Sequence, residues 1–262
     1  MSHFSVLVSL SEVTSEALDK ALQPFHEYEC TGINDDYVVF VEEDREALEI
    51  EYKDHSDDYE SFDEFIKDWH GLEFNSKGKI GRYTNPNAKW DWWTIGGRWS
   101  GKLIDKSGKT CSQAYKKDID FEGMKAASVA KNLPLYEQAQ SAFDGEVFIK
   151  WSDILKDESL TIKEKREKYH GQKAIKNFMD KFDNPFSSAE DYAMTKNEFI
   201  KKQEFLAIST FAILHDGNWL ENGEMGWWAC VSNEKEDWEE TFTKALNEIP
   251  EDNYLVVIDC HI

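Results

Sequence analysis

The sequence is poor in cysteine and has no paired-cysteine motif. Four cysteines occur among 262 residues, and they are widely separated: Cys30, Cys111, Cys230 and Cys260. In a chain of this size without an export signal, such spacing favours free thiols over a disulfide framework. No run approaches the roughly 18–20 apolar residues that span a bilayer, and the first residues have neither a basic region nor a long apolar segment. We therefore expect a cytoplasmic protein with no membrane partner.

Basic residues and phosphate-binding glycine motifs are also scarce. Asp and Glu number 52 against 30 Lys and Arg, which gives a net charge of −22. A field of that sign repels phosphate, so direct binding of nucleic acid or of an anionic membrane is disfavoured. GxGxxG, GxxxxGK[ST] and GxSxG motifs do not occur. Hydrophobic residues make up 40% of the chain, enough for a packed core.

The pattern of apolar residues predicts an α+β fold. Alternation predicts a strand over 3–10, and strand-forming apolar or aromatic runs predict strands over 36–42, 205–215, 226–231 and 254–262, with two more within 80–104 that meet at Gly96-Gly97. Helical spacing predicts helices over 14–23, 42–68, 162–182, 188–203 and 235–249. Strand-rich ends that flank a helical middle favour a mixed or antiparallel sheet rather than alternating βαβ units. We expect residues 1–150 and 204–262 to share that sheet, and residues 151–203 to form a helical insertion.

Tryptophans are concentrated in two short stretches with charged residues between them. On a strand, Trp90 and Trp92 would share one face, and Lys89 and Asp91 the other. Such a surface could clamp a planar ligand, a peptide or a protein loop, with Asp91 or Arg98 setting its orientation. The alternative is that most of these rings belong to the core. The candidate ligand- or partner-binding residues are Lys89, Trp90, Asp91, Trp92, Trp93, Arg98, Trp99, Trp227 and Trp228.

Thiol, imidazole and carboxylate groups gather near residue 26 and at the C-terminal strand. Alternation places Asp259 and His261 on one face of that strand and Cys260 on the other. A carboxylate that orients an imidazole is the arrangement of a general base. His26, Cys30 and Cys260 are weak zinc-ligand candidates, because the close His/Cys spacing of zinc motifs is missing. Packing or hydrogen bonding is the plainer interpretation, and we expect neither a metal nor a cofactor.

Negative charge is concentrated in two segments. Residues 42–68 hold thirteen acids and three bases, and residues 234–252 hold eight acids and two bases. Regularly spaced carboxylates can imitate the phosphates of duplex DNA and occupy a basic groove of a partner. A solvated face that keeps the protein soluble is the alternative. The candidate acidic partner face consists of Glu42, Glu43, Asp44, Asp57, Asp58, Glu60, Asp63 and Glu64.

Several segments resemble a group of uncharacterised proteins encoded by phages and some bacteria. The resemblance rests on MSHFSVLV at the start, PFHEYECTG at 24–32, YTNPNAKWDWWTIGGRWSG at 83–101, GEMGWW at 223–228 and DCHI at the end. It does not extend to the charged middle of the chain, 151–203, and it brings no catalytic residue with it. It implies an accessory protein made by a phage or prophage in host cytoplasm, a context that favours binding to a host component.

Two functional hypotheses follow, and a third remains open. The first is an acidic protein that binds and inhibits a basic host protein or nucleoprotein complex, such as a defence nuclease, through its acidic faces. The alternative is an enzyme or binder that acts on a nucleotide-like molecule in a tryptophan-lined pocket, with Asp259 and His261 as base. The third is a structural accessory domain that dimerises through exposed aromatic residues.

Overall fold

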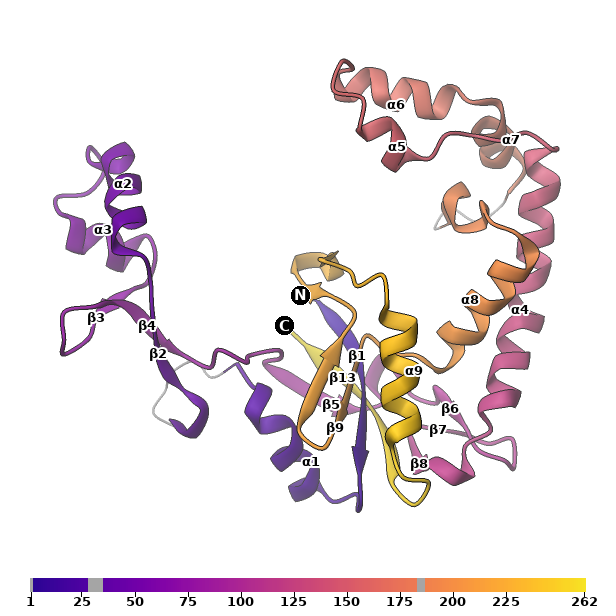
Figure 1. The fold of residues 1–262 in the computed structure, drawn as a ribbon, viewed down its shortest axis with the longest axis horizontal. Coiled ribbons are helices and arrows are strands. Elements are labelled where there is room, and N and C mark those ends of the chain that lie inside the picture. Colours follow the sequence, from indigo (N-terminus) through magenta and orange to yellow (C-terminus); the bar gives the residue numbers. More distant parts are fainter. Residues whose placement is uncertain (1, 28–34, 183–186) are drawn as a thin grey trace. The chain divides into compact units, whose positions relative to one another are not determined.

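The structure is a computed structural model that describes residues 2–27, 35–182 and 187–262. The chain forms two compact units (Figure 1). Unit 1 comprises residues 1–102, 112–117 and 211–262, and unit 2 comprises residues 103–111 and 118–210. The helical unit therefore begins well before residue 151, the boundary expected from the sequence, because the long helix from Phe121 belongs to it.

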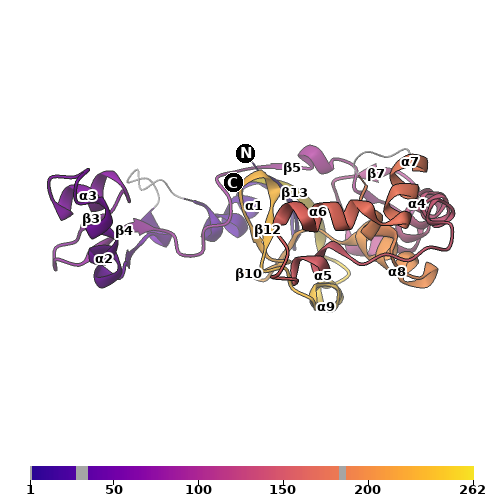
Figure 2. The same ribbon diagram turned by 90° about the horizontal axis from the view of Figure 1, so that it is seen from above.

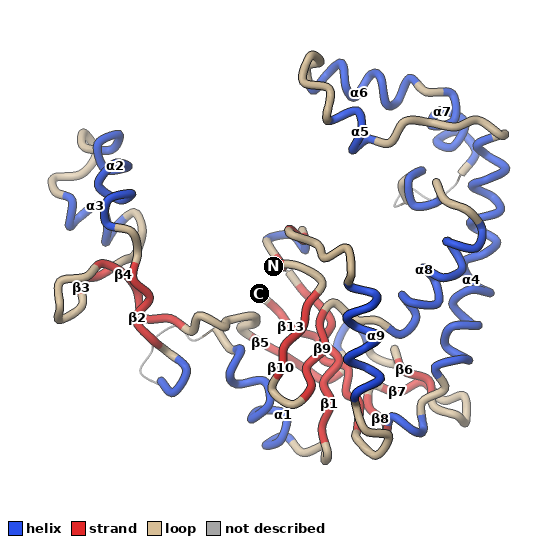
Figure 3. Tube along the Cα trace, in the orientation of Figure 1, coloured by secondary structure: helices blue, strands red, loops and turns tan. Residues whose placement is uncertain are grey.

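Unit 1 is built on a six-stranded sheet with strand order β10-β9-β1-β13-β5, in which β8 also pairs with β13 (Figure 3). Its strands are β1 (His3–Leu10), β5 (Trp92–Ile95), β8 (Gln113–Tyr115), β9 (Ala212–His215), β10 (Asn218–Glu221) and β13 (Tyr254–His261). β1 runs parallel to β9, and the other pairs are antiparallel. The central strands thus come from the two ends of the chain. This confirms the predicted α+β fold with a mixed sheet.

One face of the sheet packs on helix α1 (Ser15–Leu22). The sequence folds this way because Thr14 caps the helix through Ala17 N and Pro24 follows its last turn. Leu18 and Leu22 of the helix pack against the buried side chains of β1, β9 and β13. The core cluster comprises Phe4, Val6, Val8, Leu18, Leu22, Phe25, Trp90, Ala212, Leu214, Val256, Ile258 and Cys260. Helix α9 (Trp238–Glu248) contacts β9 and β10 (Figure 1).

A second, smaller cluster lies in the acidic N-terminal segment. Strands β2 (Val39–Glu42), β3 (Glu73–Phe74) and β4 (Ile80–Thr84) form a sheet of order β2-β4-β3. Helices α2 (Arg45–His55) and α3 (Phe62–Asp68) bury Leu48, Phe65 and Ile66 against one another and Ile80. The sequence predicted one helix over 42–68, whereas residues 56–61 form a turn that separates two. The Ser61 side chain accepts from Glu64 N and starts the second helix.

Unit 2 is mostly helical. Its helices are α4 (Phe121–Phe143), α5 (Trp151–Leu155), α6 (Ile162–Gly171), α7 (Lys173–Lys181) and α8 (Lys196–Ile208), with the short hairpin β6 (Leu103–Ile104) and β7 (Thr110–Cys111) (Figure 2). Aromatic side chains from α4, α7 and α8 fill its core, including Tyr136, Phe143, Phe178 and Phe199. Thr161 and Thr195 form capping boxes with Glu164 and Glu198 and so define where α6 and α8 begin.

The remaining elements are short. β11 (Glu224–Met225) pairs with β12 (Val231–Ser232). The 3₁₀ turns are η1 (Gln23–Phe25), η2 (Asp35–Tyr37), η3 (Gly97–Trp99), η4 (Lys116–Asp118), η5 (Ala189–Tyr192) and η6 (Trp227–Ala229). Among the residues that the structure describes, no helix combines the length and the apolar character that crossing a membrane requires.

Besides the helix over 42–68, three predicted strands and two predicted helices need correction. The first residues of the expected strand 205–215 end helix α8, and only Ala212–His215 is extended. Residues 227–229 of the expected strand 226–231 form η6, and residues 35–37 form η2 before β2 begins at Val39. The expected helix 162–182 divides at Gln172 into α6 and α7, and the expected helix 188–203 begins as η5. The sequence also predicts a turn over 31–35 and a helix break at Asn184-Pro185, and residues 31–34 and 184–185 lie outside the described residues.

The core position of Trp90 gives a stability prediction. Its side chain is 7% exposed, and Nε1 donates to the Leu22 carbonyl at 3.2 Å. We expect Trp90→Ala to lower the free energy of unfolding by about 3–5 kcal/mol, through lost burial and the cavity left behind. Trp92, which is 51% exposed, is the matched control, and Trp92→Ala should cost less than about 1 kcal/mol. Urea denaturation measures both, and equal losses would contradict the core assignment.

Candidate functional site

The end of the sheet where β1, β13 and β5 run side by side carries a cluster of polar side chains. The register pairs His3 with His261, and His261 with Trp92. Directly paired residues point to the same face, and Asp259, two residues from His261, shares it. Phe4, Trp93 and Cys260 pair with one another and point to the opposite face, into the core. We call the face with His3, Trp92, Asp259 and His261 the polar face.

Each imidazole on the polar face is held by a carboxylate. His3 Nδ1 lies 2.8 Å from Asp259 Oδ1, and His261 Nδ1 lies 2.6 Å from Asp91 Oδ1. Because an ionised carboxylate can only accept, both rings donate through Nδ1 and, when neutral, carry the lone pair on Nε2. The two rings contact each other edge to face, with centroids 5.0 Å apart. The pairing differs from the sequence-based hypothesis: Asp91 orients His261, and Asp259 orients His3.

The Nε2 atom of His261 is enclosed and has no hydrogen-bond partner among the described residues. An enclosed polar atom without a partner costs about 1–3 kcal/mol, so such atoms in native proteins call for an explanation in terms of a ligand, water or catalysis. Asp91 is further fixed through its backbone, because its N–H donates to the His261 carbonyl at 3.0 Å. The Asp91 carbonyl in turn lies 3.2 Å from His26 Nε2.

A cavity of about 610 Å³ adjoins this cluster. His261 is among its lining residues, together with Ser2, Glu27, Met225 and Gly226. The Ser2 hydroxyl donates to Gly226 O at 2.7 Å and accepts from Ala229 N at 2.9 Å, so it ties the rim of the cavity to β1. Two residues of η6 at this rim, Trp228 and Ala229, have φ of 62° and 56°. This left-handed conformation is strained for residues other than glycine.

Asp259 also anchors the glycine turn that follows β5. Its side chain is 3% exposed, and Oδ2 accepts from the Arg98 backbone N–H at 2.9 Å. Gly97 has φ of 49°, and a Cβ there would lie 2.2 Å from Asp259 Oδ2. The backbone of the turn therefore lies directly on this carboxylate. Glycine is required at this position both for its φ and for the close approach.

The structure separates the sequence-predicted binding residues into three groups. Asp91, Trp92 and the Arg98 backbone join the histidine cluster. Trp90 is in the core, Trp93 packs against it, and β5 starts only at Trp92, so the expected strand with Trp90 is wrong. Lys89 pairs with Glu221 at 2.6 Å, Trp99 is half-buried and Trp228 is exposed. The Trp227 side chain lies outside the described part. Sequence reasoning did not select His3. The only sequence signal for it was its position at the start of the first predicted strand.

Of the weak metal-ligand candidates, the structure describes His26 and Cys260, and they lie in different surroundings. Cys260 is buried in the core, where burial raises the pKa of its thiol, whereas the His26 ring packs on Trp90 with centroids 4.5 Å apart. Cys30 lies outside the described residues. Within the described residues, no group of three or more His, Cys, Asp or Glu side chains could hold a metal ion.

The N-terminal acidic face is partly neutralised by the protein's own cations. Glu42 pairs with Lys79, and Glu43 lies 3.6 Å from Arg82. Asp44 caps α2, Glu64 accepts from the Glu60 backbone N–H, and Asp58 lies 3.8 Å from His55. Asp57, Glu60 and Asp63 are exposed. Five of the eight candidate residues thus take part in local ion pairs, helix capping or backbone hydrogen bonds.

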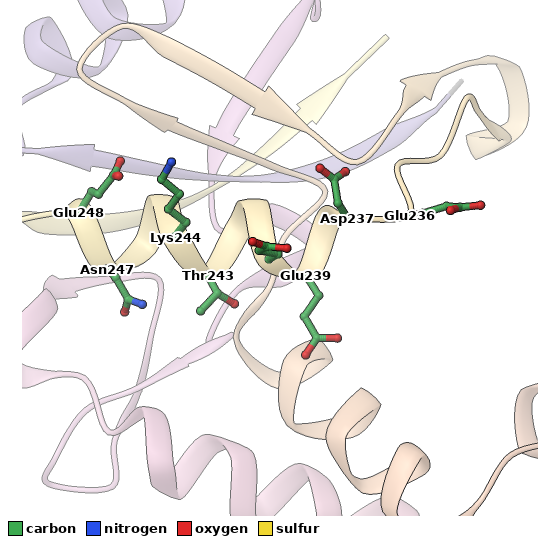
Figure 4. A pocket seen from close by; sticks show the side chains of 8 residues that line it. Glu236, Asp237, Glu239, Thr243, Lys244, Asn247 and Glu248 are labelled. Carbon is green, nitrogen blue, oxygen red and sulfur yellow. The ribbon is translucent and has the colours of Figure 1, made fainter.

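Helix α9 carries a different acidic surface (Figure 4). Trp238, Phe242, Ala245 and Leu246 are buried, and the outward positions line a hollow of about 700 Å³. We call its carboxylates, Glu236, Asp237, Glu239, Glu240 and Glu248, the acidic face of α9. None of the five forms an ion pair within the described part of the chain, whereas Glu251 and Asp252 beyond the helix pair with Lys116 and Lys117.

Comparisons with family models, curated proteins and solved structures find no match.

The close approach at Gly97 gives a second prediction. Gly97→Ala places a methyl group against Asp259. Beyond the cost of backbone strain, we expect this steric overlap to lower the free energy of unfolding by about 1–3 kcal/mol. Gly78→Ala is the control, since Gly78 also has positive φ (73°) but nothing within 4 Å of its would-be Cβ. Urea denaturation compares the two variants. Equal losses would mean that Asp259 does not constrain the turn.

Proposed function

We propose that this protein binds a small molecule at the polar face and performs acid–base chemistry on it with His261 and His3. The observation that carries the proposal is the pair of imidazoles in contact, each with Nδ1 fixed by its own carboxylate. This arrangement favours the second functional hypothesis from the sequence, an enzyme or binder for a nucleotide-like molecule, over the acidic inhibitor.

The chemistry follows from the fixed tautomers. With Nδ1–H committed to Asp91, the Nε2 lone pair of His261 can take a proton from a hydroxyl, amine or water, and the Asp91 carboxylate stabilises the resulting imidazolium. The second imidazole, His3, can supply a proton from Nε2 to a leaving or accepting atom when it is in its imidazolium form, and it regains that proton from water to complete the cycle. Positioned acid–base groups of this kind contribute about 10²–10⁴-fold to a rate.

The cavity that His261 lines supports a ligand at this end of the sheet; an enclosed imidazole nitrogen alone does not, because His70 Nε2 and His215 Nδ1 are enclosed as well. A hydroxyl or amine that reaches Nε2 of His261 would satisfy the partnerless atom, which makes its binding favourable. The cavity walls come from segments far apart in sequence, near residues 2, 27, 88, 225 and 261. Ligand-binding cavities are concave and carry a few polar groups that orient the ligand, and Ser2, Glu27 and His261 are such groups here.

The test is a ligand screen with matched histidine variants. We expect at least one compound from a panel of nucleosides, nucleotides, amino acids and sugars to raise the melting temperature of the wild type. Its affinity should fall at least tenfold, about 1.4 kcal/mol, in His261→Asn and in His3→Asn. Asparagine keeps a donor toward the carboxylate but removes Nε2, and isothermal titration calorimetry measures the change.

His215→Asn is the control for this screen. His215 belongs to the same sheet, on β9, and lies 3.5 Å from Asp216, so its replacement tests a histidine–carboxylate pair outside the cluster. Its ligand affinity should match that of the wild type. The proposal fails if no compound binds, or if all three variants bind the compound equally well.

The acidic face of α9 supports a second function, binding of a basic partner such as a host nucleoprotein in the cytoplasm. None of its five carboxylates forms an ion pair among the described residues, although Lys244 lines the same hollow, so they are available to a cationic surface. Association through such a face would be fast and weakened by salt. The resemblance to phage-encoded proteins is consistent with a host target of this kind.

This second function is tested with variants of equal net charge. Glu239→Gln/Glu240→Gln/Glu248→Gln neutralises the face, and Glu122→Gln/Glu137→Gln/Glu167→Gln removes three glutamates that already pair with lysines. We expect the first triple variant to bind a polylysine peptide several-fold more weakly at low salt, and the second to bind like the wild type. Fluorescence anisotropy measures both. Equal weakening would show that only net charge matters.

A further inference from the structure

The turn that Asp259 anchors presents a guanidinium beside the histidine cluster. Arg98 is the second residue of η3, and its backbone N–H donates to Asp259 Oδ2. Because the Asp259 side chain points to the polar face, the turn lies over that face, on the same side as His3 and His261. The Arg98 side chain itself is exposed.

Arg98 has no carboxylate partner in the described part of the chain. By contrast, two other cations of unit 1 are paired: Lys89 with Glu221 at 2.6 Å, and Arg82 with Glu43 at 3.6 Å. The carboxylate that the Arg98 backbone contacts, Asp259, accepts from His3 Nδ1 as well. Both oxygens of Asp259 therefore already have a donor.

Contacts of Gly96 and Gly97 fix the position of the Arg98 backbone. Gly97 allows the backbone to approach Asp259, and Gly96 N donates to Val257 O at 2.8 Å. A side chain that starts from a backbone fixed on both sides loses less conformational freedom on binding than one on a free loop. A planar guanidinium matches the oxygens of phosphate and carboxylate groups in a bidentate geometry.

Trp92 adds a stacking surface to the same face. Its indole is 51% exposed and meets the His3 ring edge to face, with centroids 6.3 Å apart. The polar face therefore offers an exposed aromatic ring, two oriented imidazoles and a partnerless guanidinium. An exposed indole binds planar rings by stacking.

We infer that the ligand of this site carries an anionic group, phosphate or carboxylate, which Arg98 binds, on a planar ring that stacks on Trp92. The inference rests on the proposed function, since it names the ligand class of the same site. It also gives Asp259 two roles: it orients His3 and it holds the backbone from which the anion-binding side chain extends.

The test uses two pairs of probes that differ in the anionic group. AMP and adenosine form the phosphate pair, and nicotinate and nicotinamide form the carboxylate pair. We expect the wild type to bind the anionic member of at least one pair at least tenfold more tightly than the neutral member. Arg98→Gln should reduce that ratio to about one and leave the affinity of the neutral member unchanged. Calorimetry and tryptophan fluorescence give the affinities.

Arg82→Gln is the matched control, an exposed arginine that is already paired, and it should keep the wild-type ratio. Two results would overturn the inference: neither anionic probe binds, or the anionic preference survives in Arg98→Gln. A neutral ligand whose binding depends on His261 but not on Arg98 would overturn the inference and leave the proposed function standing. Loss of the His261 dependence would instead overturn the proposed function.

Discussion

The site depends on one buried carboxylate. Asp259 is nearly inaccessible to solvent, and burial of an ion costs several kcal/mol unless hydrogen bonds replace its water. His3 Nδ1 and the Arg98 backbone N–H supply two such bonds, and hydrogen bonds to a charged group contribute about 1.5–3 kcal/mol each. The same two bonds fix the ring of one imidazole and the backbone of the glycine turn. The hydrogen bonds that stabilise this end of the sheet therefore also set the geometry of the site.

One face of the sheet packs into the core, and the other face carries the chemically active side chains. Phe4, Trp93 and Cys260 face the core, while their neighbours along the same strands carry imidazole and carboxylate groups. Strand alternation allows this division, since each residue added to a strand reverses the side that it faces. The core beneath keeps the strands in register, and the register sets the distance between the two imidazoles.

The fold could be predicted from the sequence where the pattern is periodic and local. The alternation of residues 3–10 and 254–262 and the capped helix after Thr14 match β1, β13 and α1 closely. Prediction failed where an apolar run had no period, as in 205–215, which divides between a helix end and a strand. Helix α4 was not predicted, because its apolar residues follow no single stripe and Pro134 lies within it.

The site could be predicted only in part. Sequence reasoning selected Asp91, Arg98, Asp259 and His261, because carboxylates near an imidazole have recognisable chemistry. It could not determine which carboxylate meets which ring, since that depends on strand order in the sheet: β13 lies between β1 and β5, so His261 reaches Asp91 while Asp259 reaches His3. His3 was missed for the same reason, because its partner lies 256 positions away in the sequence.

That separation affects how the molecule assembles. β1 and β13 are adjacent in the sheet, yet nearly the whole chain lies between them, including all of unit 2. Closing so long a loop is entropically unfavourable and slow compared with local helix formation. During synthesis β1 emerges long before β13 and cannot pair with it until residues 254–261 have left the ribosome. Its apolar face stays exposed over that interval, so premature termination would leave a chain whose first strand lacks its central neighbour, open to chaperones and proteases.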